Sequence, residues 1–388
     1  MTKTKGGVLV QREVVMVDAI RTPIGRKNGS LSSVHPVDLL APLLKALVER
    51  NQLDPMEIED VVTGCVTMTG EQGGNIGRMA VLAAGLPVEV PSFSLNRMCG
   101  SSQQAIHNAA QAILAGDMDV VIACGVESMS RVPMGTDLGK FSTALTKRFQ
   151  IVPQGFSAEM IADKWQISRE EMDAFSLESH QKAARAEDAG LFDRERVPVE
   201  NVGPEKVTVT HDEGIRRDTS MEKLAGLKPS FRPDGRVTAG NASQISDGAA
   251  AVLLMSGEKA AKLGLKPRAR IVSRVVVGVD PIIMLTGVIP ATRKALDRAG
   301  LKLEDIDVIE INEAFASVVL AWKREIEPDM ARVNPRGGAI ALGHPLGASG
   351  ARIMTTLLHE LEDTGGRYGL QVMCIGFGMA TGTVIERL

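Results

Sequence analysis

Short apolar runs alternate along the chain with stretches in which apolar residues recur every three or four positions. The runs at 14–18, 119–124, 250–255, 307–311 and 370–374 have the length of strands. Between them, the stretches 36–50, 102–115 and 350–361 place leucine, isoleucine or alanine on one helical face. Strands that alternate with amphipathic helices predict an α/β protein in which helices cover the sheets.

A weak internal repeat runs through this pattern. Lys45-Ala-Leu47 is followed by Asp60-Val-Val62, and Lys294-Ala-Leu296 is followed at a similar distance by Asp307-Val-Ile309. We interpret the chain as two related halves, 12–264 and 268–388. The region 126–245 is richer in charge and in turn residues, and we expect it to be an insertion in the first half that covers a ligand. Chance similarity between Ala/Leu-rich helices is the alternative explanation of the repeat.

Composition narrows the range of functions. The formal net charge of −3 means that the protein as a whole does not attract nucleic acid or an anionic membrane surface. Any phosphate group of a ligand must therefore be held by a few local residues. The four cysteines form no CxxC pair, which argues against a metal site and suits free thiols in a reducing compartment. The first residues carry no secretory signal and no long apolar run spans a membrane, so we expect a cytoplasmic protein.

The first candidate for chemistry is a cysteine in front of a helix. Residues 96–102 read Asn-Arg-Met-Cys-Gly-Ser-Ser and lead into the helical stretch 102–115. At a helix N-terminus, free backbone N–H groups and the helix dipole favour a thiolate at Cys99 and offer donors to an oxyanion. The alternative is a small, buried, inert cysteine.

A glycine-rich segment supplies a histidine. Residues 337–350 read Gly-Gly-Ala-Ile-Ala-Leu-Gly-His-Pro-Leu-Gly-Ala-Ser-Gly, and His344 is held between Gly343 and Pro345. Such glycines permit tight turns and close backbone approach. A phosphate loop is the alternative, but no GxxxxGK[ST] pattern is present.

Two further segments end apolar runs with polar or glycine residues. Asn312 follows the run 307–311, where α/β folds place ligand groups, and it could cap the helix that passes through 318–322 as well as, or in place of, such a role. Cys374 ends the run 370–374 and is followed by Gly376 and Gly378. Its thiol could act as an acid or base, or it could simply be buried.

Together and in this order, these four segments resemble the thiolase family. The resemblance extends from 19–25 to Cys374 and includes 125–130, 238–243 and 246–250. It implies the thiolase fold, in which two duplicated βαβαβαββ halves form a five-layered αβαβα core with an inserted loop domain. It also implies an acyltransferase that uses coenzyme A as co-substrate, with no permanently bound cofactor and no metal.

The resemblance assigns roles to individual residues. Cys99 would carry the acyl group, His344 would take its proton, and Cys374 would exchange the proton alpha to the thioester. His344 with a water held by Asn312, and the backbone N–H groups of Cys99 and Gly376, would stabilise the two oxyanions. The corresponding substrate-binding and CoA-binding positions are Arg216, Phe231, Ala239, Ser243, Met284, Ala314 and Phe315.

Departures from the family pattern bear on the substrate. Acetyl-CoA-specific biosynthetic thiolases usually carry a His-Met-Gly segment, where this chain has Ile-Val-Pro-Gln-Gly at 151–155. Phe377 and Met379 stand where many thiolases have glycine and glutamine, and Leu285 and Val288 also depart. These differences favour a degradative 3-ketoacyl-CoA thiolase for bulky acyl chains and resemble actinobacterial thiolases of sterol breakdown.

Other functions remain possible from the sequence. The closest is a biosynthetic acetyl-CoA C-acetyltransferase that condenses two acetyl-CoA molecules. A non-catalytic acyl-CoA or lipid-binding protein of the same fold is the alternative from another class, although such relatives tend to lose a catalytic thiol. By resemblance we expect a homo-oligomer, a dimer or tetramer, whose other partners are acyl-CoA molecules.

Overall fold

The computed structural model describes residues 12–388, so the opening residues 1–11, on which the expectation of no secretory signal rests, lie outside the description. The first half and the insertion contain β1 Val14–Arg21, β2 Gly25–Arg26, α1 Pro36–Arg50, β3 Asp60–Gly64, α2 Ile76–Ala83, β4 Ser92–Leu95, α3 Ser101–Ala115, β5 Val120–Ser128, α4 Thr143–Arg148, α5 Gln154–Lys164, α6 Arg169–Asp188, β6 Val199–Val202, β7 Val207–Val209, α7 Met221–Ala225, β8 Ser246–Ser256 and α8 Gly257–Lys262. The second half contains β9 Ala269–Gly278, α9 Val288–Ala299, β10 Val308–Ile311, α10 Ala316–Ile326, α11 Ala339–Leu342, α12 Ser349–Thr364, β11 Tyr368–Ile375 and β12 Met379–Arg387.

The two halves have the same strand arrangement. In the first, the order is β4-β3-β5-β8-β1, with β3 parallel to β4 and β5, and β8 antiparallel to both of its long neighbours. In the second, the order β10-β11-β12-β9, with one parallel pair followed by two antiparallel pairs, matches the order and directions of β3-β5-β8-β1. This shared order and direction confirm the predicted duplication. We propose the same division of the chain, 12–264 and 268–388, with the insertion leaving after β5 and returning at β8.

The halves are not identical. The counterpart of β4 in the second half is reduced to a single bridge between Ile309 and Val333. The antiparallel pairing of Val15 with Arg270 and of Met16 with Ala269 joins β1 to β9 and makes the strands one continuous path.

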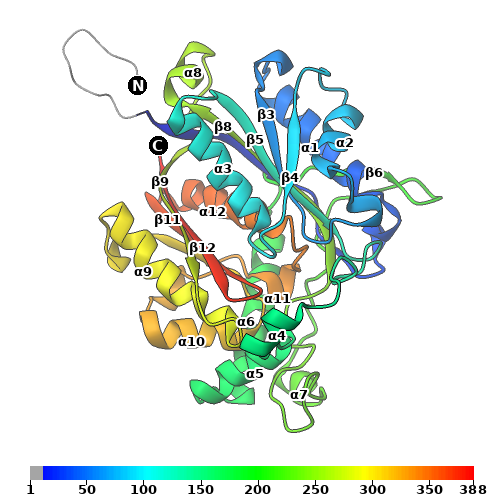
Figure 1. Ribbon diagram of the computed structural model, residues 1–388, viewed down its shortest axis with the longest axis vertical. Helices are drawn as coiled ribbons and strands as arrows, with labels where there is room; N and C mark the ends of the chain where they lie inside the picture. Colours follow the sequence, from blue (N-terminus) through cyan, green and yellow to red (C-terminus); the bar gives the residue numbers. More distant parts are fainter. Residues whose placement is uncertain (1–11) are drawn as a thin grey trace.

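Three apolar clusters account for the layers. One fills the space between the two halves of the sheet with the buried faces of α3 and α12. A second packs α1 and α2 on the outer face of the first half, and a third packs α9 and α10 on the outer face of the second. The order is therefore helix, sheet, helix, sheet, helix, as predicted, and Figure 1 shows α3 and α12 between the outer helix pairs.

The central helices fix where chemistry can occur. Because α3 and α12 begin at the same end of the core, the turns in front of them, which hold Cys99 and His344, face each other across the sheet ends. Close packing holds this arrangement, since a Cβ on Gly350 would lie 2.3 Å from the backbone nitrogen of Gln103. Positions where two backbones approach this closely accept only glycine.

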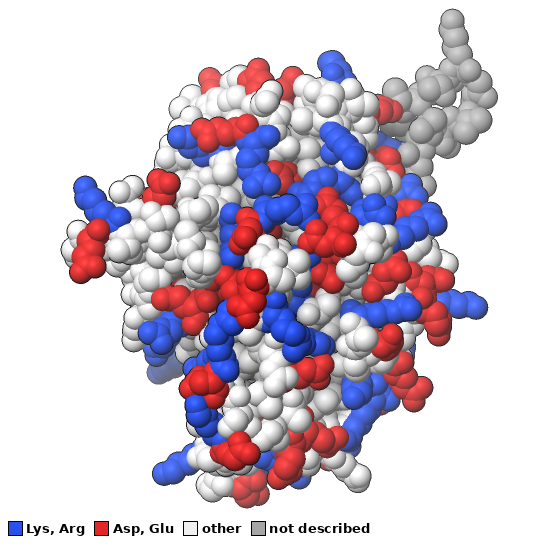
Figure 2. Space-filling model, turned by 180° about the vertical axis from the view of Figure 1, so that it is seen from behind, with Lys and Arg blue, Asp and Glu red and all other residues white. Residues whose placement is uncertain are grey.

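The surface carries mixed charge. Figure 2 shows Lys and Arg interleaved with Asp and Glu over the face seen from behind, in line with the small net charge. Within residues 12–388, none of the helices is both long and apolar enough to cross a membrane.

Candidate active site

Cys99 is presented by a tight turn between β4 and α3. Met98 adopts a left-handed conformation with φ of 46°, which is uncommon for a non-glycine residue. Asn96 Oδ1 accepts the N–H of Met98 at 2.7 Å, and Ser101 Oγ donates to the Met98 carbonyl at 2.6 Å. The turn is therefore held by side chains on both sides, and Cys99 lies just in front of α3, as predicted.

Cys374 lies near the end of β11, and the turn that follows reaches back to Cys99. The turn 376–378 joins β11 to β12, with φ of 60° at Phe377 and 78° at Gly378. A side chain at 378 would lie 2.4 Å from the Val279 carbonyl oxygen, so only glycine fits there. The end of β11 packs on the turn of the nucleophile, since a Cβ on Gly100 would lie 2.4 Å from Ile375 Cδ1.

His344 is fixed in one tautomer by the residues around it. Its backbone N–H lies 3.2 Å from both the Gln244 carbonyl and Ser246 Oγ. Its Nδ1 lies 2.5 Å from Ser349 Oγ, while that hydroxyl donates its own proton to the Pro345 carbonyl at 2.8 Å. Ser349 must then accept from Nδ1–H, which leaves the lone pair on Nε2 free to act as a base.

Asn312 connects the histidine to the second thiol. Its Nδ2 lies 3.5 Å from His344 Nε2 and 3.8 Å from Cys374 Sγ. The suggested capping role is wrong, because α10 begins at Ala316 with Phe315 at its N-cap. The buried Oδ1 of Asn312 has no hydrogen-bond partner in the described part of the chain. An unpaired acceptor in a buried position is where an ordered water or a ligand donor would bind.

Burial dominates the charge states of the three reactive groups. It raises the pKa of the Cys99 thiol to about 11, against the hydrogen bonds from Gln154 and from the N–H groups of Gly376 and Cys99. Burial, followed by the charge of Cys99, raises the pKa of Cys374 to about 12. Burial, and to a smaller extent the positive charge of Arg352, lowers the pKa of His344 to about 3.

These pKa values correct one sequence expectation. The helix N-terminus was expected to favour a thiolate at Cys99, but desolvation outweighs its donors in the empty site. At neutral pH the site therefore holds two thiols and a neutral imidazole. Among residues 12–388 no hydrogen bond joins Cys99 to His344, so their proton transfer has to accompany the attack on a substrate.

Four of the residues predicted to bind CoA or substrate form one contiguous surface. The Phe231 and Phe315 rings meet edge to face with centroids 6.1 Å apart, and the backbone N–H of Ser243 donates to the Ala314 carbonyl at 2.9 Å. Met284 belongs to the same apolar cluster, and its sulfur is 3.3 Å from the backbone nitrogen of Phe377 in the turn that follows Cys374.

Arg216 and Ala239 are exposed. Arg216 is held through its backbone N–H, which donates to His180 Nδ1 at 3.1 Å, and its guanidinium makes no ion pair with a described residue. Its neighbour Arg217 is paired with Asp188 at 2.7 Å. Arg216 is therefore the one of the two that is available to an anion.

Sequence reasoning missed three residues that hold the site together. Gln154 Nε2 lies beside the turn after Cys374, where a Cβ on Gly376 would be 2.9 Å away, and the only signal was that its segment departs from the family pattern. Ser349 fixes the tautomer of His344 from within the same glycine-rich segment. Glu127 accepts N–H groups of Val66 at 2.9 Å and of Gly347 at 2.8 Å, which ties the histidine loop to the first half.

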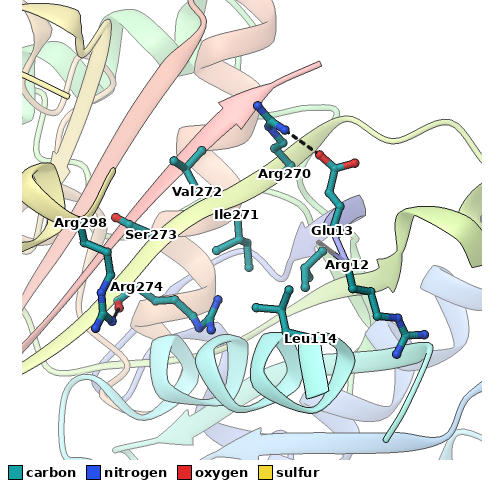
Figure 3. Close-up of a pocket in the computed structure, with 10 residues that line it drawn as sticks. Arg12, Glu13, Leu114, Arg270, Ile271, Val272, Ser273, Arg274 and Arg298 are labelled. Atoms are coloured by element: carbon teal, nitrogen blue, oxygen red, sulfur yellow. Dashed lines mark hydrogen bonds and ion pairs between the residues drawn. The ribbon is translucent and has the colours of Figure 1, made fainter. Parts of the chain in front are cut away.

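A separate surface pocket lies outside this site. It measures about 780 Å³ and lies between the end of α3 and β9, with Arg12, Arg270, Arg274 and Arg298 in its wall (Figure 3). It contains none of the predicted site residues.

Comparisons with known proteins match nearly the whole chain to one family. A family model described as "Thiolase, N-terminal domain" matches residues 14–258, and one described as "Thiolase, C-terminal domain" matches residues 265–387. A steroid 3-ketoacyl-CoA thiolase of Mycobacterium tuberculosis is 51% identical, covering 98% of this chain and 95% of the relative. A beta-ketoadipyl-CoA thiolase of Pseudomonas aeruginosa is 49% identical, covering 98% and 100%.

Two solved structures have the same fold as this chain over nearly its whole length. Human mitochondrial 3-ketoacyl-CoA thiolase superimposes with a TM-score of 0.90 at 40% identity, covering 98% of this chain and 100% of that one. The acetyl-CoA acetyltransferase of Bacillus anthracis gives a TM-score of 0.91 at 41% identity, covering 97% and 99%.

Proposed function

The chain belongs to the thiolase family, and from this premise we propose that it is a 3-ketoacyl-CoA thiolase that works through an acyl group on Cys99. It is an acyltransferase that cleaves a 3-ketoacyl-CoA to acetyl-CoA or propionyl-CoA and a shortened acyl-CoA. The observation that carries the proposal is the arrangement around Asn312. Its side-chain amide faces both His344 Nε2, at 3.5 Å, and Cys374 Sγ, at 3.8 Å.

In the cleavage half-reaction, the Cys99 sulfur attacks the ketone carbon and its proton passes to His344 Nε2. The N–H groups of Cys99 and Gly376 bind the resulting oxyanion. The bond between C2 and C3 then breaks, leaving the acyl group on Cys99 and the enolate of acetyl-CoA. The Cys374 thiol, which is protonated at neutral pH, gives its proton to C2.

In the transfer half-reaction, an incoming CoA thiol gives its proton to the Cys374 thiolate. The CoA sulfur attacks the acyl carbon, and Cys99 leaves and regains its proton from His344. Between the half-reactions the imidazolium and the Cys374 thiolate neutralise each other, so no net charge is created in the buried site. The protonated Nε2, together with a water held by Asn312, can donate to the enolate oxygen.

CoA binding offers a matched pair of variants. We propose that Arg216 contacts the CoA phosphates, because its guanidinium has no described carboxylate partner, whereas Arg217 is paired with Asp188 at 2.7 Å. An exposed charge–phosphate contact contributes modestly, so Arg216→Ala should raise KM for CoA by about five- to tenfold and leave kcat within about twofold. Steady-state thiolysis at varied CoA measures both constants. Arg217→Ala, the control, should leave KM unchanged, and equal effects of the two variants would refute the assignment.

The acyl side of the site supports a bulky substrate. The Phe377 ring meets Phe141 of the insertion edge to face, with centroids 6.0 Å apart, and the buried Met284 contacts the Phe377 backbone nitrogen. This aromatic pair stands where a glycine would leave open space, and it offers apolar contact to a long or cyclic acyl group. The relatives named above include a steroid 3-ketoacyl-CoA thiolase and a beta-ketoadipyl-CoA thiolase.

A substrate panel tests this proposal. Purified enzyme would be assayed for thiolysis of acetoacetyl-CoA, 3-ketodecanoyl-CoA and a 3-ketoacyl-CoA that carries a cyclohexyl group, with Cys99→Ala as the blank. We expect kcat/KM for the larger substrates to exceed that for acetoacetyl-CoA by about tenfold or more, since each well-packed methylene adds about 1–3 kcal/mol. Equal or faster turnover of acetoacetyl-CoA would refute the substrate assignment and favour the biosynthetic acetyltransferase.

We also propose that the protein is a homo-oligomer found in the cytoplasm. The outer edge of β4 pairs with no strand of the described chain, and Phe93 on it is 40% exposed. This free edge supports an oligomer in which the β4 edges of two copies meet. The four unpaired cysteines suit a reducing compartment such as the cytoplasm.

A further inference from the structure

The surface pocket between the end of α3 and β9 has the size of a ligand site. Its volume of about 780 Å³ lies within the range of roughly 300–1,000 Å³ that small-molecule sites occupy. Arginine side chains stand around it, and Val14, Leu114 and Ile271 supply apolar contact (Figure 3). A pocket that combines apolar wall with several guanidiniums is suited to an organic anion.

Two of the four arginines are neutralised within the chain. Arg12 forms an ion pair with Asp119. Arg270 donates to Glu13 at 3.0 Å and to Glu386 at 2.7 Å. These two arginines therefore shape the wall of the pocket and add little net charge to it.

The other two, Arg274 and Arg298, have no carboxylate partner. Within residues 12–388 neither guanidinium forms an ion pair, and Arg298 donates to the Arg274 carbonyl oxygen at 2.7 Å. Residues 1–11 contain no Asp or Glu, so no other carboxylate of the chain can neutralise them. Burial, and to a smaller extent the charge of Arg298, lowers the pKa of Arg274. Two neighbouring cations that repel each other are stabilised by an anion bound to both.

A β-bulge turns Arg274 into the pocket. The register of β9 against β12 shifts at Val272, which has no partner there. Ser273 then faces α9, where its hydroxyl donates to the Ala295 carbonyl at 2.8 Å. Because neighbouring residues of a strand point to opposite faces, Arg274 points to the other side, over α3 (Figure 3). The unpaired cation is thus placed there by the backbone of the sheet.

We propose that this pocket binds a small molecule that carries a phosphate or diphosphate group, which Arg274 and Arg298 hold. Two unpaired guanidiniums match the charge of about −2 on a phosphate ester, whereas a carboxylate brings only one charge. The organic part of the ligand contacts Leu114 and Ile271. The enclosed volume favours a molecule of nucleotide size over an acidic segment of another protein. The site is separate from the CoA contact proposed at Arg216 and does not depend on thiolase activity.

Binding can be measured without turnover. The full chain would be titrated with inorganic pyrophosphate and with ADP in an isothermal calorimeter. Arg274→Gln and Arg298→Gln should each raise the Kd of pyrophosphate by about tenfold or more, because a hydrogen bond to a charged group contributes that much. Tighter binding of ADP than of pyrophosphate would support a nucleotide-like ligand that uses the apolar wall, and equal binding would support an inorganic diphosphate.

Two control variants show where the anion binds. Arg293 lies on α9 like Arg298 but is paired with Glu325 at 3.3 Å outside the pocket, so Arg293→Gln should bind pyrophosphate like the wild type. Arg216→Ala should also bind it normally. Thermal unfolding would confirm that each variant is folded, and the exposed Arg298 provides the variant to use if Arg274→Gln is not.

Four results would overturn the proposal. The first is that neither pyrophosphate nor ADP binds to the wild-type protein. The second is an equal loss of affinity in Arg293→Gln and in the two pocket variants. The third is a loss of pyrophosphate binding in Arg216→Ala with none in the pocket variants, which would place the anion in the CoA site. The fourth is tighter binding of a tetra-aspartate peptide than of ADP, which would indicate an acidic protein partner.

Discussion

Replacing Cys99 with alanine should lower thiolysis by at least about 10⁴-fold while leaving the fold intact. The Cys99 sulfur carries the acyl group between the two half-reactions, so no other described group can substitute for it. The change removes one sulfur from a turn that is held by Asn96 and Ser101, not by the thiol itself. CoA-dependent loss of a 3-ketoacyl-CoA, followed at high enzyme concentration, measures the residual rate.

A second buried cysteine provides the control for this variant. Cys124 lies in β5, and its sulfur is 3.1 Å from Thr63 Oγ1. Cys124→Ser retains that hydrogen bond and should keep activity within about threefold, since the residue lies in the core and contacts no substrate. A Cys99→Ala enzyme with more than a few per cent of wild-type activity would rule out the acyl-Cys99 pathway.

Replacing Cys374 with alanine should have the second largest effect, and the effect should differ between the two half-reactions. Burial and the charge of Cys99 raise the pKa of Cys374 to about 12, so in the resting enzyme it is a proton donor. Without it, the enolate that leaves in cleavage has no acid at C2, and we expect carbon–carbon cleavage to fall by roughly 10²–10⁴-fold. Formation of the acyl-cysteine from a saturated acyl-CoA breaks no carbon–carbon bond and should fall less.

Two assays separate these steps. Thiolysis of a 3-ketoacyl-CoA reports cleavage, and exchange of labelled CoA into a saturated acyl-CoA reports acyl transfer alone. Cys374→Ala should lose at least about tenfold more of the first activity than of the second. Equal losses would mean that Cys374 supports the geometry of the site through Asn312, which lies 3.8 Å from its sulfur, and does not supply the proton.

Local patterns were sufficient to predict much of the fold. The helix expected at 36–50 occurs at Pro36–Arg50, and those expected at 102–115 and 350–361 occur as α3 and α12 with small changes at their ends. Strands β9 and β12 were not predicted, because β9 interrupts its valines with arginines and β12 carries threonine and glycine at positions that only the assembled sheet buries. Those strands gain their apolar environment from each other, from β11 and from the buried face of α9.

In the site, too, the residues that lie in sequence motifs were predicted, whereas properties that depend on packing between distant segments were not. Sequence motifs indicated Cys99, His344, Asn312 and Cys374, because glycine-flanked turns at strand and helix ends are visible in the chain itself. The direction of the Cys99 pKa was wrong, since the helix dipole can be inferred locally but the extent of burial cannot. Gln154 was not predicted as a site residue, because nothing in its own segment shows that α5 is packed against the turn after β11.

The most direct test of the account is to locate the acyl group on the protein. Wild-type enzyme would be mixed with a 3-ketoacyl-CoA in the absence of free CoA, quenched in acid within a second and digested for peptide mass mapping. We expect the mass of the shortened acyl group on the peptide that contains Cys99, and its disappearance when CoA is added before the quench. Acyl mass on the Cys374 peptide, or a fully active enzyme with no acyl mass on any cysteine, would contradict the mechanism.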